Sequence, residues 1–130
     1  MEALQGISGA IASFDIQLWL LLVFGILLGL IVGVLPGLTF VMGVLLILPF
    51  TYGMATDASI VLMLAVYLAG TYGGALTAIL LHIPGEPNNV PLLWDGYGMN
   101  KQGRAAEALG WVAVSALIGG LCSWFLLAFA

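Results

Sequence analysis

The sequence predicts an all-α integral membrane protein with about three to four transmembrane helices and at least one broken or re-entrant segment. Of its 130 residues, 63% are hydrophobic and 6% are charged, and the mean hydropathy is +1.22. A soluble domain carries about 25% charged residues. Several apolar runs also approach or exceed the roughly 20 residues that a membrane-spanning helix needs. The length of the chain suits one transmembrane helical unit over residues 1–130.

Charge and composition exclude several classes of function. The net charge is −4, and Lys101 and Arg104 are the only basic residues. The chain therefore offers no basic surface for nucleic acid and no polybasic anchor for anionic lipid. Cys122 is the single cysteine, so no disulfide forms within the chain. The sequence shows no metal-binding cluster, no nucleophile with a base and no phosphate loop, so we expect neither an enzyme nor a resident cofactor.

Residues 16–35 form the first expected span. These 20 residues rise about 30 Å as a helix, which matches the hydrocarbon core of a bilayer. Before them, residues 1–14 are of mixed character, and we expect a short interfacial helix or a loose leader. Glycine recurs every fourth residue of the span and just beyond it, at Gly25, Gly29, Gly33 and Gly37. This spacing predicts a groove along one side of the helix that contacts another helix closely.

A short second run follows the Pro36–Gly37 break, which ends the first span. Residues 38–52 rise only about 22 Å and contain Pro49, so they fit a tilted span, a half-helix or a re-entrant segment. Thr39 lies near the start of this run. The N-terminus of a half-helix offers free N–H groups and a partial positive charge, which suits an anion. The alternative is an ordinary turn between two hairpin helices.

The third run, residues 58–82, carries adjacent glycines at Gly73 and Gly74. Such a pair weakens a helix and frees backbone groups that lipid cannot satisfy. We therefore expect a break here that lines a cavity, as broken helices do in transporter binding sites. The competing interpretation is that the small residues let a neighbouring helix approach. His82 at the end of the run is either a proton relay or a neutral interfacial side chain.

Residues 83–104 differ in kind from the runs on either side. They hold three of the five prolines, two adjacent asparagines and both basic residues, yet they keep apolar side chains such as Trp94 and Tyr97. We expect this segment to pack against the helices or to dip into the membrane interface. Residues 108–130 then form the final span. Because basic residues favour the cytoplasmic side, three crossings before Lys101 place the N-terminus outside, whereas a re-entrant second run places it inside.

The candidate binding site combines the two expected breaks with the proline-rich segment. Half-helix N-termini meet anionic groups in transporters while unwound carbonyls hold the coupling ion, so a carboxylate fits without a buried arginine. The alternative is that these positions are structural turns only. We expect Glu86, Asp95 and Glu107 to be solvated. The candidate residues are Pro36, Gly37, Thr39, Gly73, Gly74, Thr77, Pro84, Gly85, Asn88 and Asn89.

Four stretches occur in an order that resembles a known family. They are G-L-I-V-G-V-L-P-G-L-T at residues 29–39, L-P-F-T-Y-G-M at 48–54, Y-G-G-A-L-T-A-I-L-L-H-I-P-G-E at 72–86 and D-G-Y-G-M-N-K-Q-G-R-A at 95–105. Together they are similar to the N-terminal part of the large membrane (permease) subunit of tripartite tricarboxylate transporters. The family pattern usually has serine where Ala75 stands and asparagine where His82 stands, and its subunit is several times longer.

The resemblance implies a multi-pass subunit in the bacterial inner membrane that takes up carboxylates as a secondary transporter by symport. It implies two protein partners, a small membrane subunit and a periplasmic solute-binding protein that delivers the substrate. The implied coupling ion is Na⁺ or H⁺. Two alternatives stay open: a non-transporting helical scaffold that assembles through its glycine groove, and a truncated, non-functional fragment of the permease.

Overall fold

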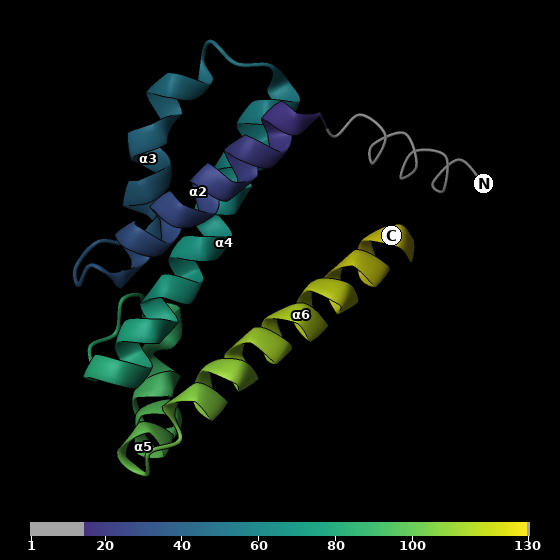
Figure 1. The fold of residues 1–130 in the computed structure, drawn as a ribbon. Helices are drawn as coiled ribbons and strands as arrows, with labels where there is room; N and C mark the ends of the chain where they lie inside the picture. Colours follow the sequence, from purple (N-terminus) through teal and green to yellow (C-terminus); the bar gives the residue numbers. More distant parts are fainter. Residues whose placement is uncertain (1–14, 130) are drawn as a thin grey trace.

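The computed structural model describes residues 15–129, and every element in that range is helical, which confirms the all-α fold (Figure 1). The elements are α2 (Ile16–Val34), α3 (Phe40–Thr51), α4 (Thr56–Leu81), the 3₁₀ helix η1 (Pro87–Leu93), α5 (Asp95–Lys101) and α6 (Ala105–Phe129). By length and composition, α2, α4 and α6 can each cross a membrane, and α3 is a shorter apolar helix. The segment expected at residues 1–14 lies outside the described residues.

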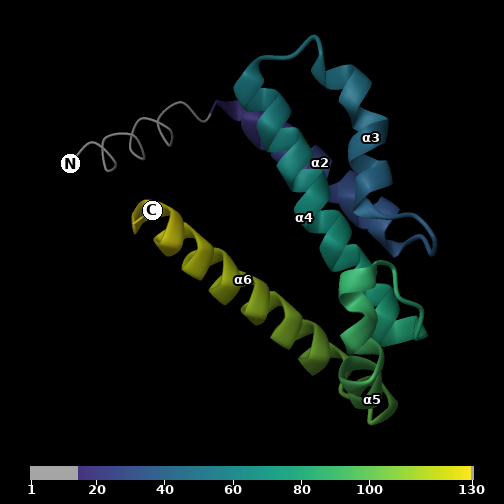
Figure 2. The same cartoon turned by 180° about the vertical axis from the view of Figure 1, so that it is seen from behind.

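Helices α2 and α4 lie side by side and run in the same direction (Figures 1 and 2). Glycines of α2 meet small residues or backbone of α4 in rising order along both helices: Gly25 with Ala65, Gly29 with Ala69 and Gly33 with Gly70. Two helices approach each other this closely only where at least one of them carries small residues. The predicted glycine groove is therefore confirmed for these three positions, and its partner is α4.

Helix α3 returns the chain to the end at which α2 begins. Because α2 and α4 are parallel, the segment between them must run the opposite way, and α3 does so with the turns at residues 35–39 and 52–55. Its 12 residues rise about 18 Å, and Pro49 lies inside the helix near its end. Ile47 of α3 packs with Leu62 and Val66 of α4 in the buried core. The second run therefore returns the chain along α4, so α4 starts at the same end as α2.

Helix α4 continues without a break through Gly73 and Gly74, so the break expected there is wrong. A methyl group on Gly73 would lie 3.0 Å from the Cα of Gly33, which shows that these glycines serve close helix contact. The helix ends instead at His82, which adopts a left-handed conformation with φ of 59°. Its backbone N–H donates to the carbonyl of Thr77 and closes the last turn.

The chain reverses its direction after α4. Residues 83–94, which we call the return hairpin, run back along α4 before the chain turns again into α5. Asn89 Nδ2 donates to the carbonyl oxygen of Thr71 over 3.4 Å, whereas Asn100 Nδ2, farther along, donates to that of Ile79 over 2.9 Å. Along residues 83–100, the contacts thus move toward the start of α4 and then back toward its end. The expectation that residues 83–104 pack against the helices is confirmed.

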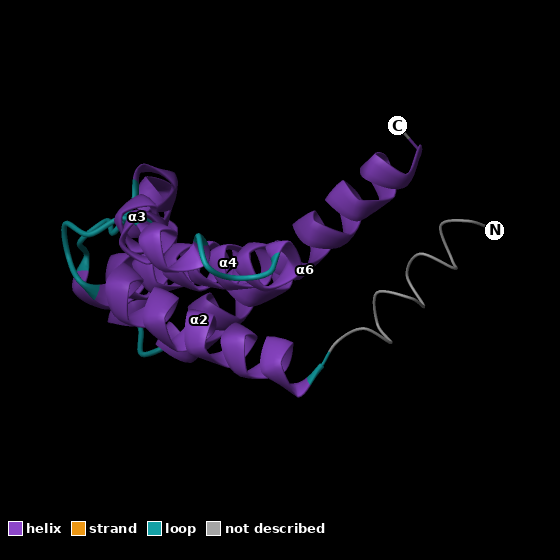
Figure 3. Cartoon of the chain, turned by 90° about the horizontal axis from the view of Figure 1, so that it is seen from above, coloured by secondary structure: helices purple, strands orange, loops and turns teal. Residues whose placement is uncertain are grey.

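Helix α6 leaves the other helices after its first turn (Figures 1 and 3). Ala108 is its one buried residue, and the hydroxyl of Tyr72 in α4 donates to the carbonyl of Leu109 over 3.4 Å. Just before the helix, Arg104 forms an exposed ion pair with Glu107 at 2.6 Å. The hydrogen bonds and charge of Glu107 raise the pKa of Arg104. Beyond its start, α6 presents apolar side chains on all sides.

Candidate functional site

Four segments meet at one junction: the end of α2, the start of α3, the second half of α4 and the return hairpin. Glycines allow this meeting. A methyl group on Gly85 would lie 2.6 Å from the Cα of Gly74 and 3.1 Å from Thr77 Oγ1. A methyl group on Gly74 would lie 2.6 Å from Asn89 Nδ2. Real side chains do not approach that closely. A side chain at position 85 would collide with the backbone of α4, whereas one at position 74 would require the Asn89 side chain to move.

Glu86 is the charged group of the junction. Its side chain is 3% exposed, and its Oε1 accepts a hydrogen bond of 2.6 Å from the backbone N–H of Phe40, the first residue of α3. Thr39, at the N-cap of α3, makes no side-chain capping bond of its own. A carboxylate at a helix N-terminus gains a charge-assisted hydrogen bond and a favourable interaction with the helix dipole. Glu86 therefore caps α3 from a distant part of the chain.

The expectation that Glu86 is solvated is wrong, while Asp95 and Glu107 are exposed as expected. The reason lies in the turn that precedes it. Gly85 packs against α4, and this contact directs the next side chain toward the uncapped start of α3. A buried carboxylate is costly unless it is hydrogen-bonded, and the free N–H of Phe40 supplies that bond.

Two neutral polar side chains complete the junction. Thr77 is 2% exposed, and its hydroxyl donates to the carbonyl of Gly74 over 2.9 Å. Asn89 is 5% exposed and uses its amide on the carbonyl of Thr71. The hydroxyl oxygen of Thr77 and the amide oxygen of Asn89 keep acceptor capacity after these bonds. The junction thus combines a carboxylate, oxygen acceptors and a helix N-terminus, which are groups that can bind a cation or an anion.

The structure brings six of the ten predicted residues to the junction and leaves four outside it. Those at the junction are Thr39, Gly73, Gly74, Thr77, Gly85 and Asn89. The others are exposed: Pro36, Gly37, Pro84 and Asn88. Gly37 has a φ of 89° in the turn after α2, and no atom lies within 4 Å of where its Cβ would be. It shapes a turn, as the alternative interpretation of a structural turn predicts, and the space beside it is open.

Sequence reasoning missed Gly33 and Glu86 as parts of the junction. Gly33 was assigned to the glycine groove, yet its carbonyl oxygen also lies against Gly85. The available signal for Glu86 was an acidic residue directly after a Pro–Gly turn with no basic residue near it in sequence. His82 lies outside the junction, is exposed, and has its ring centroid 4.3 Å from that of Tyr97. Among residues 15–129 there is no group of histidine, cysteine and acidic side chains that could hold a metal ion.

Comparison with known proteins identifies the family. A family model described as the tripartite tricarboxylate transporter TctA family matches residues 19–130. The chain belongs to the TctA family. The family resemblance stated from the four sequence stretches is thereby confirmed. The description of that family names a tripartite transporter.

One curated relative extends the match. The chain is 38% identical over 106 residues to an uncharacterized 52.8 kDa protein from the TAR-I ttuC' 3' region of Agrobacterium vitis. The alignment covers 82% of this chain and 21% of the relative, so the TctA-family chain spans about a fifth of the length of that relative. No solved structure matches the chain.

Proposed function

We propose that this chain is the N-terminal part of the permease subunit of a secondary transporter that takes up carboxylates through the bacterial inner membrane. A periplasmic solute-binding protein delivers the substrate, and a small membrane subunit completes the assembly. A gradient of Na⁺ or H⁺ drives uptake. Membership of the TctA family supports the transporter class, and one observation supports the substrate class: the half-buried start of α3 already holds a carboxylate, that of Glu86.

The proposed mechanism is an exchange of carboxylates at α3. A substrate carboxylate has the same charge and the same acceptor oxygens as Glu86, so it competes for the N–H of Phe40 and the positive end of the helix dipole. Once released, Glu86 carries an unpaired negative charge, which Na⁺ or H⁺ neutralises. Uptake of the anion is thereby linked to uptake of the cation. Thr77 and Asn89 lie within the same junction and offer oxygen acceptors to that cation.

The four exposed candidates have a proposed role at the edge of this junction. Pro36 and Gly37 form the turn that fixes where α3 begins, and Pro84 and Asn88 lie in the return hairpin on either side of Glu86. We propose that they let the hairpin move when the substrate displaces Glu86. Scaffold assembly through the glycine groove has less support, because α4 fills that groove at Gly25, Gly29 and Gly33.

The test is uptake of ¹⁴C-labelled citrate and succinate by cells that express the complete permease with its small subunit and binding protein. Glu86→Gln removes the charge but keeps the shape, and Asp95→Asn makes the same change at an exposed acid. We expect Glu86→Gln to lower uptake by about tenfold or more, the equivalent of one charged hydrogen bond, and Asp95→Asn to leave it unchanged. Equal uptake by both variants, at equal membrane levels, would refute the exchange.

A further inference from the structure

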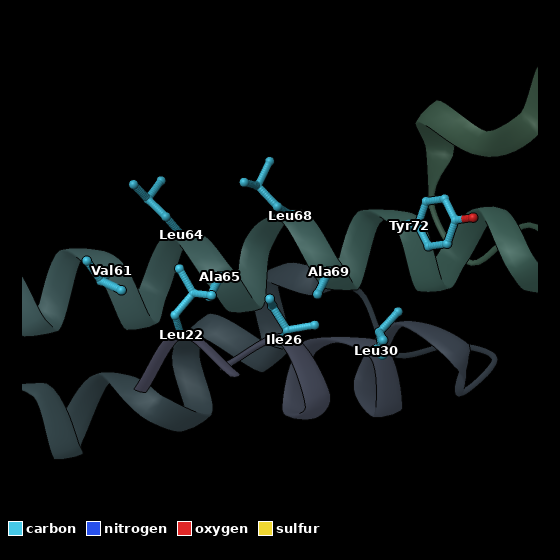
Figure 4. A pocket seen from close by; sticks show the side chains of 9 residues that line it. All are labelled: Leu22, Ile26, Leu30, Val61, Leu64, Ala65, Leu68, Ala69 and Tyr72. Carbon is cyan, nitrogen blue, oxygen red and sulfur yellow. The ribbon is translucent and has the colours of Figure 1, made fainter. Parts of the chain in front are cut away.

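Helix α4 makes apolar contacts with α2 and polar contacts with the return hairpin. Between α2 and α4 runs a groove of about 460 Å³, and the side chains that line it are apolar except that of Tyr72 (Figure 4). The hydroxyl of Tyr72 already donates to the carbonyl of Leu109. The return hairpin instead meets α4 through a hydrogen bond at Thr71 and a close contact at Gly74. Control over a bound carboxylate is therefore to be sought on the hairpin.

Asn89 holds the return hairpin on α4. Its side chain is buried, and its Nδ2 donates to the carbonyl oxygen of Thr71 over 3.4 Å. Gly74 provides the space for this bond, because a methyl group there would lie 2.6 Å from Asn89 Nδ2. The same methyl group would lie 3.4 Å from Glu86 Cγ. Asn89 and Glu86 therefore pack against the same glycine of α4.

One turn of 3₁₀ helix joins Asn89 to Glu86. Glu86 is the N-cap of η1, and its carbonyl accepts a hydrogen bond of 3.0 Å from the backbone N–H of Asn89. Side chains three residues apart lie on the same face of a 3₁₀ helix. Both of these are buried, whereas the intervening Pro87 and Asn88 are exposed. A shift of Asn89 away from α4 therefore also moves Glu86 and its hydrogen bond at the start of α3.

The hydrogen bond between Asn89 and Thr71 can open at low cost. Its length of 3.4 Å exceeds the usual N–H···O distance of about 2.9–3.0 Å, so the bond is weak. Thr71 lies inside α4, and its carbonyl also accepts the hydrogen bond of the helix itself. When Asn89 leaves, that carbonyl keeps a partner.

We propose that Asn89 is a positioning residue whose bond to Thr71 sets how strongly Glu86 competes with a substrate carboxylate at α3. The inference rests on the proposed function, in which the substrate replaces Glu86. While Asn89 is bound to α4, Glu86 occupies the N–H of Phe40 and excludes the substrate. The apparent affinity of a ligand falls by the fraction of protein that is ready to bind it. A weaker Asn89 bond therefore raises the affinity for the carboxylate.

Alkylation at position 39 reports whether Glu86 is seated on α3. Thr39 is half-buried and directly precedes Phe40, so departure of Glu86 gives a reagent access to Thr39→Cys. The assay uses the complete permease in membranes, in the Cys122→Ser background and without substrate. We expect Asn89→Ala to speed alkylation by N-ethylmaleimide about threefold or more, the effect of one lost hydrogen bond. Alkylation at the rate of the parent protein would overturn the proposal.

Asn100→Ala is the matched control. Asn100 Nδ2 also donates to a carbonyl oxygen of α4, that of Ile79, over 2.9 Å, but it lies in α5, outside the turn that carries Glu86. We expect Asn100→Ala to leave the alkylation rate unchanged. We also expect Asn89→Ala to add nothing once Glu86→Ala is present. Equal acceleration by both asparagine variants, or acceleration that does not need Glu86, would show a general loosening and refute the positioning role.

Gly74→Ala tests the same bond with Asn89 in place. Its methyl group crowds Asn89 Nδ2, so we expect it to speed alkylation of Thr39→Cys as well. An unchanged rate in Gly74→Ala would contradict the inference.

Citrate presented by the binding protein separates this inference from the proposed function. We expect Asn89→Ala to lower the concentration of loaded binding protein that half-protects Thr39→Cys by the same factor by which it speeds alkylation. Faster alkylation with no protection by citrate would refute the proposed exchange and leave the positioning of Glu86 by Asn89 in place. Protection by citrate that Asn89→Ala does not alter would refute the positioning role and leave the exchange in place.

Discussion

At the scale of single residues, Glu86 joins two segments that lie 46 residues apart in sequence. Its carboxylate satisfies an N–H that the start of α3 leaves free, and Phe40 in turn gives the buried charge its hydrogen bond. Burial of the Glu86 carboxylate or of the Phe40 N–H would cost free energy if the other group were absent. The position of the return hairpin and the position of α3 are consequently coupled through one hydrogen bond, which a competing carboxylate can replace.

We predict that substitutions of Glu86 lower stability in a defined order. Glu86→Ala leaves the N–H of Phe40 without its partner and should cost about 1–3 kcal/mol, whereas Glu86→Gln keeps an acceptor oxygen and should cost about 1 kcal/mol. Chemical or thermal unfolding of the purified permease measures both values. Asp95→Ala, at an exposed acid, serves as the control. An alanine variant as stable as wild type would show that the buried bond contributes nothing.

The contacts of some glycines could be predicted from the sequence, and those of others could not. The repeat at Gly25, Gly29 and Gly33 predicted close helix packing, and the structure confirms it because a four-residue repeat defines one face of a helix. Gly73 and Gly74 fit either a break or a contact, and local sequence could not decide between them. The deciding factors were the α2 backbone and the return hairpin, which lie 40 residues before and about 11 residues after them in the chain.

At the scale of elements, α4 is the helix on which the fold is built. Helices α2 and α3 pack on it, the return hairpin and α5 lie against its second half, and α6 contacts it at Tyr72. Its contacts with α2 and the hairpin are made by backbone atoms that glycines leave accessible. Stability at these contacts should therefore depend strongly on the absence of side chains.

We predict opposite effects for two glycine-to-alanine substitutions in helices. Gly33→Ala places a methyl group against the backbone of Gly70 and should destabilise the permease by about 1–3 kcal/mol through overpacking. Gly98→Ala in α5 meets no atom within 4 Å and should stabilise by about 0.5–1 kcal/mol, because alanine restricts the unfolded chain. Unfolding measured for both variants tests the contact. Destabilisation by Gly98→Ala together with a neutral Gly33→Ala would contradict it.

The long helices were predictable as elements, and the return hairpin was not. Residues 16–35 and 58–82 were expected as spans, and they correspond to α2 and α4 within two residues at each end, because apolar length alone defines a span. The path of residues 83–94 depends on Gly85 against α4 and on Asn89 bonding to Thr71. Those contacts are long-range, and hydropathy carries no information about them.

At the scale of the whole molecule, the parallel arrangement of α2 and α4 sets the topology. The turn at residues 52–55 and the turn at residues 101–104 lie at opposite ends of α4. With Lys101 and Arg104 on the cytoplasmic side, as the positive-inside rule favours, the turn at 52–55 lies on the opposite side of the membrane. Helix α2 then also begins on that opposite side, because it runs parallel to α4.

Cysteine labelling in whole cells tests this topology. In a Cys122→Ser background, we expect Gly53→Cys to react with a membrane-impermeant maleimide added outside and Gln102→Cys to react only after the cells are opened. Both positions lie in exposed turns. Reaction of both cysteines from the same side would contradict the parallel arrangement, whereas exchange of the two sides would contradict only the charge-based orientation.

The central claim is that a substrate carboxylate binds where Glu86 now contacts α3, and protection of a cysteine beside that contact measures it most directly. Thr39 is half-buried at the N-cap of α3 and makes no side-chain capping bond, so Thr39→Cys in the Cys122→Ser background reports on this point. We expect citrate presented by the binding protein to slow its alkylation by N-ethylmaleimide severalfold and to leave Gln102→Cys unaffected. Equal alkylation of Thr39→Cys with and without citrate, in a permease that takes up citrate, would contradict the account.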